Sequence, residues 1–188
     1  PLLSAKELAY QITDSGAAAV VIMDSLFEQR LWQIRDKVPS LATIVVANVG
    51  HFLPPVKRIL GTLFKKIPTG KVAPIRGKEI LPFAKVLRRN ESFSGDPGIS
   101  AQDTCLIQYT GGTTGTPKGT VLTHANMAAN FTQARQWLNF EIGNDILCSG
   151  FPFFHLAGLA FGMIAMGTAN TQCLIPDPRN TKHISKEI

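Results

Sequence analysis

AAAVVIM, residues 17–23, is a continuous apolar run, and LATIVVA at residues 41–47 repeats the pattern. Runs of this kind are typical of strands that are buried on both faces of a parallel sheet. The segment between them carries apolar residues at helical spacing, namely Leu26, Phe27, Leu31, Ile34 and Val38. Alternating helices and buried strands predict an α/β fold, doubly wound, with a mostly parallel sheet and flanking helices.

The same pattern extends outward from these strands in both directions. Ser4 and Glu7 have capping-box spacing, so we expect a short helix from there to Gly16. After Asp103 the alternation resumes, with strands and helices expected as follows: strand 104–109, strand 119–122, helix 126–138, strand 145–150, helix 156–168 and strand 172–175. The predicted organisation is an α/β half at 1–50, a basic, proline-rich excursion from the sheet at 51–100, and a second α/β part at 101–188.

The positive charge is concentrated in the excursion. The chain has a formal net charge of +6, and residues 57–89 contain ten Lys/Arg but only one acid, Glu79. Within this stretch, residues 56–67 place six apolar side chains on one helical face: Val56, Ile59, Leu60, Leu63, Phe64 and Ile67. Such a helix either lies in an anionic membrane surface or packs its apolar face on its own protein. Gly61 in mid-helix costs about 1 kcal/mol relative to alanine and weakens the first interpretation.

Other function classes find little support. Only Phe64 and Phe83 interleave with the basic residues, so we expect no nucleic-acid partner. The three cysteines, Cys105, Cys148 and Cys173, sit in apolar runs without metal-ligand spacing, so we expect reduced core residues in a cytoplasmic protein. The longest apolar stretch, 156–166, is too short to span a bilayer. The chain opens without Met and stops as a helix begins, so we expect it to be a piece of something longer.

The chemistry is concentrated in IQYTGGTTGTPKG, residues 107–119. Its glycines allow tight turns and close approach of backbone N–H groups to an anion, its threonines add hydroxyl donors, and Lys118 adds a charge suited to phosphate oxygens. The predicted phosphate-binding residues are Thr110, Gly111, Gly112, Thr113, Thr114, Gly115, Thr116 and Lys118. The P-loop pattern is excluded because Pro117 precedes the lysine, and the dinucleotide fingerprint is absent. The alternative is a flexible hairpin between two strands.

Residues 107–118 resemble, position by position, the signature of the adenylate-forming superfamily of acyl-CoA synthetases, peptide-synthetase adenylation domains and luciferases, with Gly111 where many members have serine. FPFFH at 151–155 resembles the aromatic-histidine turn of their acyl or aryl pocket, and residues 1–21 resemble the segment before their first strand. The resemblance covers most of the chain and is weakest between 50 and 95. It implies that the chain is one subdomain of the adenylate-forming N-terminal domain.

The resemblance also implies a two-step reaction that uses ATP, Mg²⁺ and coenzyme A. A carboxylate attacks the α-phosphate of ATP, and a thiol then displaces AMP from the acyl-adenylate. The loop ending at Lys118 would hold the β- and γ-phosphates, Thr110 would lie near the magnesium ion, and His155 would orient the acyl group. A histidine that merely closes an apolar turn is the alternative for His155. The magnesium glutamate, the ribose-binding aspartate and the catalytic lysine of the C-terminal domain fall outside 1–188, so we expect this chain alone to be inactive.

The substrate follows from two further likenesses. LPPVKRILGTLFKKIP at 53–68 is similar to an insertion in bacterial long-chain fatty acid–CoA ligases, and QYTGG at 108–112 is similar to their version of the loop. The implied partners are a fatty acid, ATP, CoA and the remainder of the enzyme, with peripheral contact at the inner face of the membrane through 56–67 as one interpretation. Two alternatives stay open. The first is an amino- or aryl-acid adenylation domain, whose known members usually lack the excursion, and the second is a noncatalytic nucleotide- or acyl-binding module.

Overall fold

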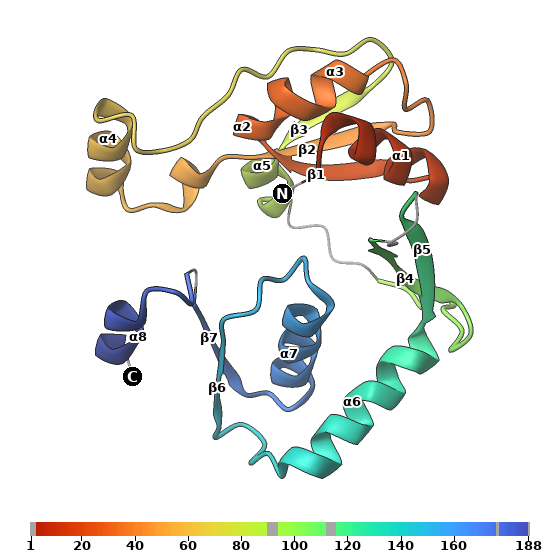
Figure 1. The fold of residues 1–188 in the computed structure, drawn as a ribbon, viewed down its shortest axis with the longest axis vertical. Coiled ribbons are helices and arrows are strands. Elements are labelled where there is room, and N and C mark those ends of the chain that lie inside the picture. The colour runs from red at the N-terminus through yellow and green to blue at the C-terminus, as the bar shows by residue number, and fades with distance from the viewer. Residues whose placement is uncertain (1–2, 90–93, 112–115, 176, 188) are drawn as a thin grey trace. The chain divides into compact units, whose positions relative to one another are not determined.

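The computed structural model describes residues 3–89, 94–111, 116–175 and 177–187 (Figure 1). The chain forms two compact units, Pro1–Asp96 and Pro97–Ile188. Both combine strands with flanking helices, and parallel strand pairs occur in each. The predicted α/β architecture is therefore confirmed.

The first unit begins with the predicted capped helix. Its elements are α1 (Ala5–Ser15), β1 (Ala19–Met23), α2 (Asp24–Leu26), the π-helix η1 (Phe27–Leu31), α3 (Trp32–Ile34), β2 (Thr43–Ala47), the 3-10 helix η2 (Val49–Phe52), α4 (Pro55–Leu63), β3 (Glu79–Pro82) and α5 (Phe83–Leu87). The Ser4 hydroxyl accepts from the Glu7 N–H and the Glu7 carboxylate accepts from the Ser4 N–H, at 3.3 and 2.7 Å. Gly16 ends α1 in the left-handed conformation, with φ of 65°. Both ends of α1 thus follow from local sequence.

The sheet of this unit has the order β1-β2-β3, with every pair parallel. Thr43 lies opposite Ala19 on one side and opposite Glu79 on the other. The prediction that residues 51–100 stay outside the sheet is wrong at Glu79–Pro82, where the chain returns to pair with β2. This strand has four residues and ends in proline, so it is too short to show a periodic pattern.

The core of the first unit lies between the sheet and the helices after β1. Its most buried side chains are Phe27, Leu31, Ile34, Val38, Leu41 and Ile44. β1 itself is not buried on both faces as predicted, because Ile22 is buried but Val21 is 64% exposed. β1 is an edge strand of this sheet, and the described helices cover only one of its faces.

The second unit carries the motif. Its elements are β4 (Thr104–Thr110), β5 (Lys118–Thr123), α6 (His124–Leu138), β6 (Ile146–Ser149), α7 (Leu156–Gly167), β7 (Thr171–Leu174) and α8 (Thr181–Glu187). β4 and β5 form an antiparallel hairpin, and β6 pairs with β7 in parallel. Leu147 of β6 packs with Ile164 and Ala165 of α7 in a small core.

The cysteines are not core residues. Cys105 and Cys148 are exposed, and Cys173 is half-buried. Along β6 the burial alternates, so Leu147 and Ser149 are buried while Cys148 between them lies on the other face. An apolar run predicted burial here, but alternation along a strand covered on one face sets it.

Candidate functional site

The loop that is predicted to bind phosphate is the connection of the β4–β5 hairpin. Thr110, the last residue of β4, lies directly opposite Lys118, the first residue of β5. In an antiparallel ladder opposite Cα atoms are about 4.5–5.5 Å apart, so the pairing holds both ends of the loop together. Thr110 and Lys118 are exposed, and no carboxylate among the described residues forms an ion pair with Lys118. Its ammonium group is therefore available to an anionic ligand.

The predicted cradle is described at its two ends. Gly111 and Thr116 are exposed beside the Thr110–Lys118 pair. Gly112, Thr113, Thr114 and Gly115 lie outside the described residues. The predicted roles of all of these residues stay predictions.

Gly119 has a packing role. It pairs with Tyr109 across the hairpin, and a Cβ at Gly119 would lie 2.8 Å from Ile107 Cγ2 and 3.2 Å from the Tyr109 ring. The absence of a side chain therefore lets these two residues of β4 pack across the β5 backbone. Gly119 was not among the predicted phosphate-binding residues, and the structure gives this fourth glycine of residues 107–119 a packing reason.

The hairpin continues into α6 through a second capping box. The Thr123 hydroxyl accepts from the Asn126 N–H at 3.2 Å, and Asn126 Oδ1 accepts from the Thr123 N–H at 3.0 Å. The sequence predicted a helix from residue 126, whereas α6 begins at His124 with Thr123 as its cap. The spacing of Thr123 and Asn126 could have identified it.

His155 begins α7. Its Nδ1 accepts from the Ala157 N–H at 3.2 Å, and its ring stacks on Phe151 with centroids 6.2 Å apart. Because Nδ1 is an acceptor, the neutral imidazole carries its proton on Nε2. His155 is exposed, so Nε2–H can donate to a carboxylate or phosphate oxygen. Thus the turn gives the His155 side chain both a capping role and a free donor, and the two side-chain contacts described, with Ala157 and Phe151, are local.

Glycine also fixes this turn against α7. A Cβ at Gly158 would lie 2.2 Å from the Pro152 carbonyl oxygen, so only glycine permits the observed approach. Phe153 crosses α7 at Gly162 in the same way, with 2.6 Å to Phe153 Cε1. The aromatic-histidine turn is thereby held against the helix that it caps.

An open cleft of about 500 Å³ lies beside the turn. Phe151 and Phe153 line one part of it, and Leu174, Ile175 and the exposed Asp177–Arg179 ion pair line another. Arg179, 2.9 Å from the carboxylate, lowers the pKa of Asp177 through a hydrogen bond. The cleft is at the carboxyl ends of parallel strands β6 and β7, where open α/β sheets bind ligands. Sequence reasoning missed Leu174, Ile175, Asp177 and Arg179.

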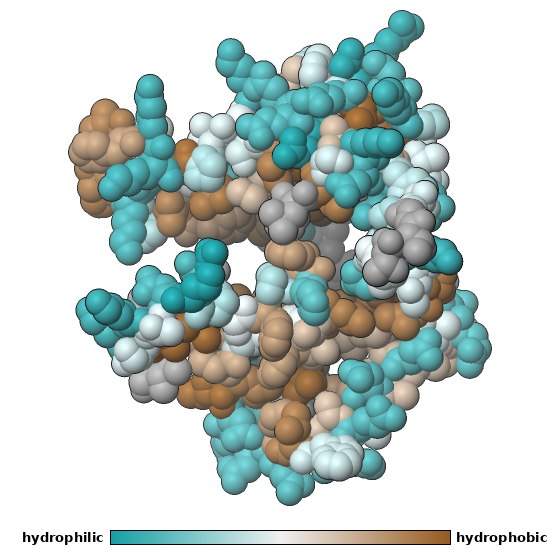
Figure 2. Space-filling view, in the orientation of Figure 1, coloured by the Kyte–Doolittle hydropathy of each residue, from teal (hydrophilic) through white to brown (hydrophobic). Residues whose placement is uncertain are grey.

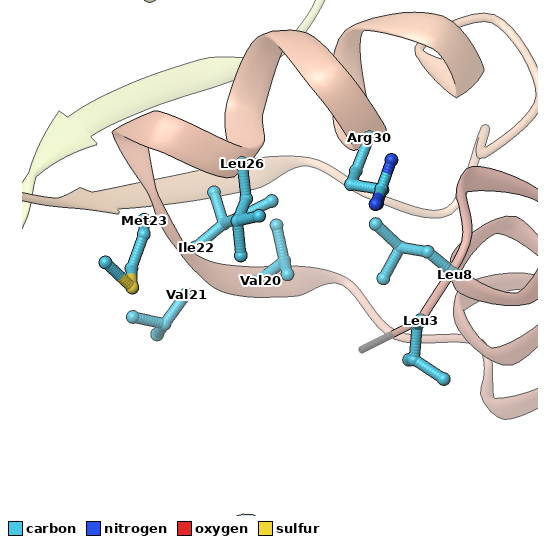
Figure 3. A pocket seen from close by; sticks show the side chains of 8 residues that line it. All are labelled: Leu3, Leu8, Val20, Val21, Ile22, Met23, Leu26 and Arg30. Atoms are coloured by element: carbon cyan, nitrogen blue, oxygen red, sulfur yellow. The ribbon is translucent and has the colours of Figure 1, made fainter. Parts of the chain in front are cut away.

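A smaller cavity of about 240 Å³ lies in the first unit (Figure 3). Seven apolar side chains and Arg30 line it, from α1, β1 and the helices that follow. None of the predicted site residues is among them. With so few polar groups, it offers no chemistry that matches the motif.

Metal binding by protein groups alone finds no support in the described part of the chain. No cluster of three or more His, Cys, Asp or Glu side chains occurs there. Mg²⁺ usually keeps few protein ligands and binds together with substrate phosphates. A single hydroxyl at Thr110 fits that mode.

Comparison with known proteins identifies the family. The sequence profile of the AMP-binding enzyme family matches residues 1–188. The chain belongs to this family. It is 29% identical over 194 residues to a long-chain-fatty-acid–CoA ligase of Salmonella typhimurium, covering 100% of this chain and 34% of the relative. With the Bacillus subtilis protein of the same name it shares 34% identity over 167 residues, or 85% of this chain and 28% of the relative.

The fold is shared with enzymes of other substrates. The anthranilate CoA ligase AuaEII, solved with anthranoyl-AMP, matches 97% of this chain and 31% of its own with a TM-score of 0.66 at 19% identity. The chain spans about a third of the length of the curated relatives it matches. As a family member it is a portion of the adenylate-forming N-terminal domain, and its relatives are acid–thiol ligases.

Proposed function

We propose that the protein containing this chain activates a long-chain fatty acid with ATP and transfers the acyl group to coenzyme A. The observation that carries the proposal is the pairing of Thr110 with Lys118 at the open end of the hairpin, within a motif of the AMP-binding enzyme family. Relatives named long-chain-fatty-acid–CoA ligases, at 29 and 34% identity, support the substrate.

Each described residue has a role that its position allows. Lys118 would bind β- and γ-phosphate oxygens and so reduce the repulsion between ATP and an approaching carboxylate. Bound Mg²⁺ would neutralise further phosphate charge, with the Thr110 hydroxyl as one ligand. His155 would donate from Nε2 to an oxygen of the acyl carboxylate or α-phosphate. The apolar walls of the cleft, Phe151 and Phe153, suit an acyl chain.

The chemistry balances without an oxidant or reductant. A carboxylate oxygen forms a bond to the α-phosphorus, and the bond to pyrophosphate breaks. The CoA thiol then loses its proton, its sulfur bonds to the acyl carbon, and AMP departs. Because the chain spans a third of its relatives' length, we expect the second step to need groups outside residues 1–188.

Pyrophosphate release by the full-length protein tests the proposal. Acids from acetate to oleate, with benzoate and several amino acids, are compared in wild type, Lys118→Ala and Lys37→Ala, the last being an exposed lysine of the first unit. A charge-assisted hydrogen bond contributes about 1.5–3 kcal/mol, so Lys118→Ala should lower kcat/KM for ATP about 10- to 150-fold while Lys37→Ala has no effect. Equal activity of the two variants would reject the loop assignment.

The acid series separates the alternatives. Preference for long acyl chains supports the fatty-acid ligase, and preference for an aryl or amino acid would replace the substrate but keep the loop. The shared fold of an anthranilate CoA ligase makes the aryl acid a specific competitor. If none of the acids gives pyrophosphate release although the protein binds ATP, the noncatalytic binding module is favoured.

A further inference from the structure

Two cysteines lie opposite each other on the strands that lead to the cleft. β6 and β7 are parallel, and Cys148 pairs directly with Cys173 in their register. Side chains at directly paired positions project from the same face of a sheet. Leu147 packs against α7, so the two thiols lie on the opposite face. Figure 2 shows hydrophobic residues, in brown, at the surface over β6 and β7.

Both thiols are accessible on this face of the second unit. Cys148 is exposed and Cys173 is half-buried. Ile146 and Thr171, which pair with each other two residues earlier on the same face, are exposed as well. A small reagent in solution can therefore reach the pair of cysteines.

The separation of the two cysteines suits a covalent bond between them. Neighbouring strands lie about 4.7–4.9 Å apart, and a disulfide joins Cα atoms that are about 4.4–6.8 Å apart. The two thiols already interact, because a hydrogen bond with Cys173 raises the pKa of the Cys148 thiol. Cys105 provides a contrast, since it is exposed on β4 and the partner strand β5 contains no cysteine.

We propose that Cys148 and Cys173 form a dithiol site that a small organic disulfide, such as glutathione disulfide, oxidises reversibly to an internal disulfide bond. One cysteine thiolate attacks a sulfur of glutathione disulfide, a mixed disulfide forms, and the glutathione thiolate that leaves takes up a proton. The other cysteine then loses its proton, its sulfur bonds to the first cysteine, and a second glutathione leaves. The two cysteines lose two electrons and two protons, which reduce one glutathione disulfide to two glutathione molecules.

Proximity decides which product accumulates. The raised pKa keeps the Cys148 thiolate scarce at neutral pH, so the first attack is slow. The second attack is intramolecular, and the effective concentration of a well-placed group far exceeds that of a free thiol. The internal bond should therefore form at the expense of the mixed disulfide. It would lie next to Ser149 and Leu174, which line the cleft, but the inference does not rest on the proposed function.

Oxidation of the full-length protein tests the proposal without ATP, acid or CoA. The reduced, folded protein is incubated with glutathione disulfide, the remaining thiols are blocked with N-ethylmaleimide, and the cysteine peptides are identified by mass spectrometry. We expect a peptide pair that is linked through Cys148 and Cys173 and that dithiothreitol separates. Cys105 should carry glutathione or N-ethylmaleimide, and equal linkage of Cys105 to either cysteine would overturn the proposal.

Single substitutions provide the matched controls. In Cys173→Ser the glutathione adduct on Cys148 should be at least about tenfold more abundant than in wild type, because no second thiol displaces it. Cys148→Ser should do the same for Cys173, and Cys105→Ser should leave the linked pair unchanged. Stable glutathione adducts on both cysteines of the wild type would overturn the proposal. A bond that forms only after unfolding in urea would overturn it too, because the rest of the protein would then cover the thiols.

Discussion

Gly158→Ala is the most informative single change in the turn that carries His155. Gly158 lies inside α7, where alanine is normally favoured over glycine by about 1 kcal/mol. Here the new methyl group would lie 2.2 Å from the Pro152 oxygen, 2.6 Å from the Pro152 carbonyl carbon and 2.7 Å from the Phe151 oxygen. All three are backbone atoms and cannot rotate away. Overpacking costs about 1–3 kcal/mol, and the rigid neighbours place this site at the upper end.

Subtracting the helix-propensity gain leaves a net destabilisation of about 2 kcal/mol. For a chain of this size that corresponds to a melting temperature lower by about 4–8 °C, measured by scanning calorimetry. Gly162→Ala is a graded control, since its close neighbour is the Phe153 side chain, which is half exposed and can move. Gly95→Ala, with nothing within 4 Å, should change little. A higher melting temperature for Gly158→Ala, as helix propensity alone demands, would refute the packing argument.

Two further predictions concern titration. Hydrogen bonds from the backbone and side chain of Ser4 lower the pKa of Glu7 from 4.5. The Glu7 carboxylate therefore stabilises the fold above pH 4.5, and this contribution is lost as the pH falls through the pKa of the folded state. In thermal melts the loss of stability in acid should be smaller for Glu7→Gln than for wild type, and identical pH profiles would contradict this prediction. The hydrogen bond with Cys173 raises the pKa of the exposed Cys148 thiol. At neutral pH the Cys148 thiol should therefore be alkylated faster in Cys173→Ala than in wild type. The alkylation rate is measured by mass spectrometry, with Cys105 as internal reference. Equal rates for Cys148 in the two proteins would refute the interaction.

The parts of the fold that were predictable are those set by neighbours in sequence. The capping box of Ser4 and Glu7 and the left-handed Gly16 were identified because the atoms involved are within a few residues. β3 was missed because its only signal is pairing with β2, which lies over 30 residues earlier. The exposure of Val21 and Cys148 was missed because it depends on which face of a strand the rest of the chain covers.

The candidate site likewise has features that depend on local sequence and features that depend on distant parts of the chain. The residue types of the loop predict phosphate binding, since glycine, threonine and lysine have few other reasons to occur in that order, and this role stays a prediction. The cleft beside Phe151 was not predictable, because Asp177 and Arg179 reach it only through the parallel pairing of β6 with β7. The packing role of Gly119, which borders the predicted loop, was also not predictable, because it depends on Ile107 and Tyr109 across the hairpin.

A hairpin by itself does not distinguish a phosphate cradle from a flexible connection, since both interpretations require strands on either side. The position of the strand ends is what favours the cradle. Strand pairing stops at Thr110 and Lys118, so a hydroxyl lies next to an ammonium group that forms no ion pair with any described residue. A purely connecting loop needs neither group there, and charged lysine gains nothing from an exposed threonine as its neighbour. An anionic ligand between them would satisfy both, and Lys118→Ala is therefore the substitution on which the proposed function depends most directly.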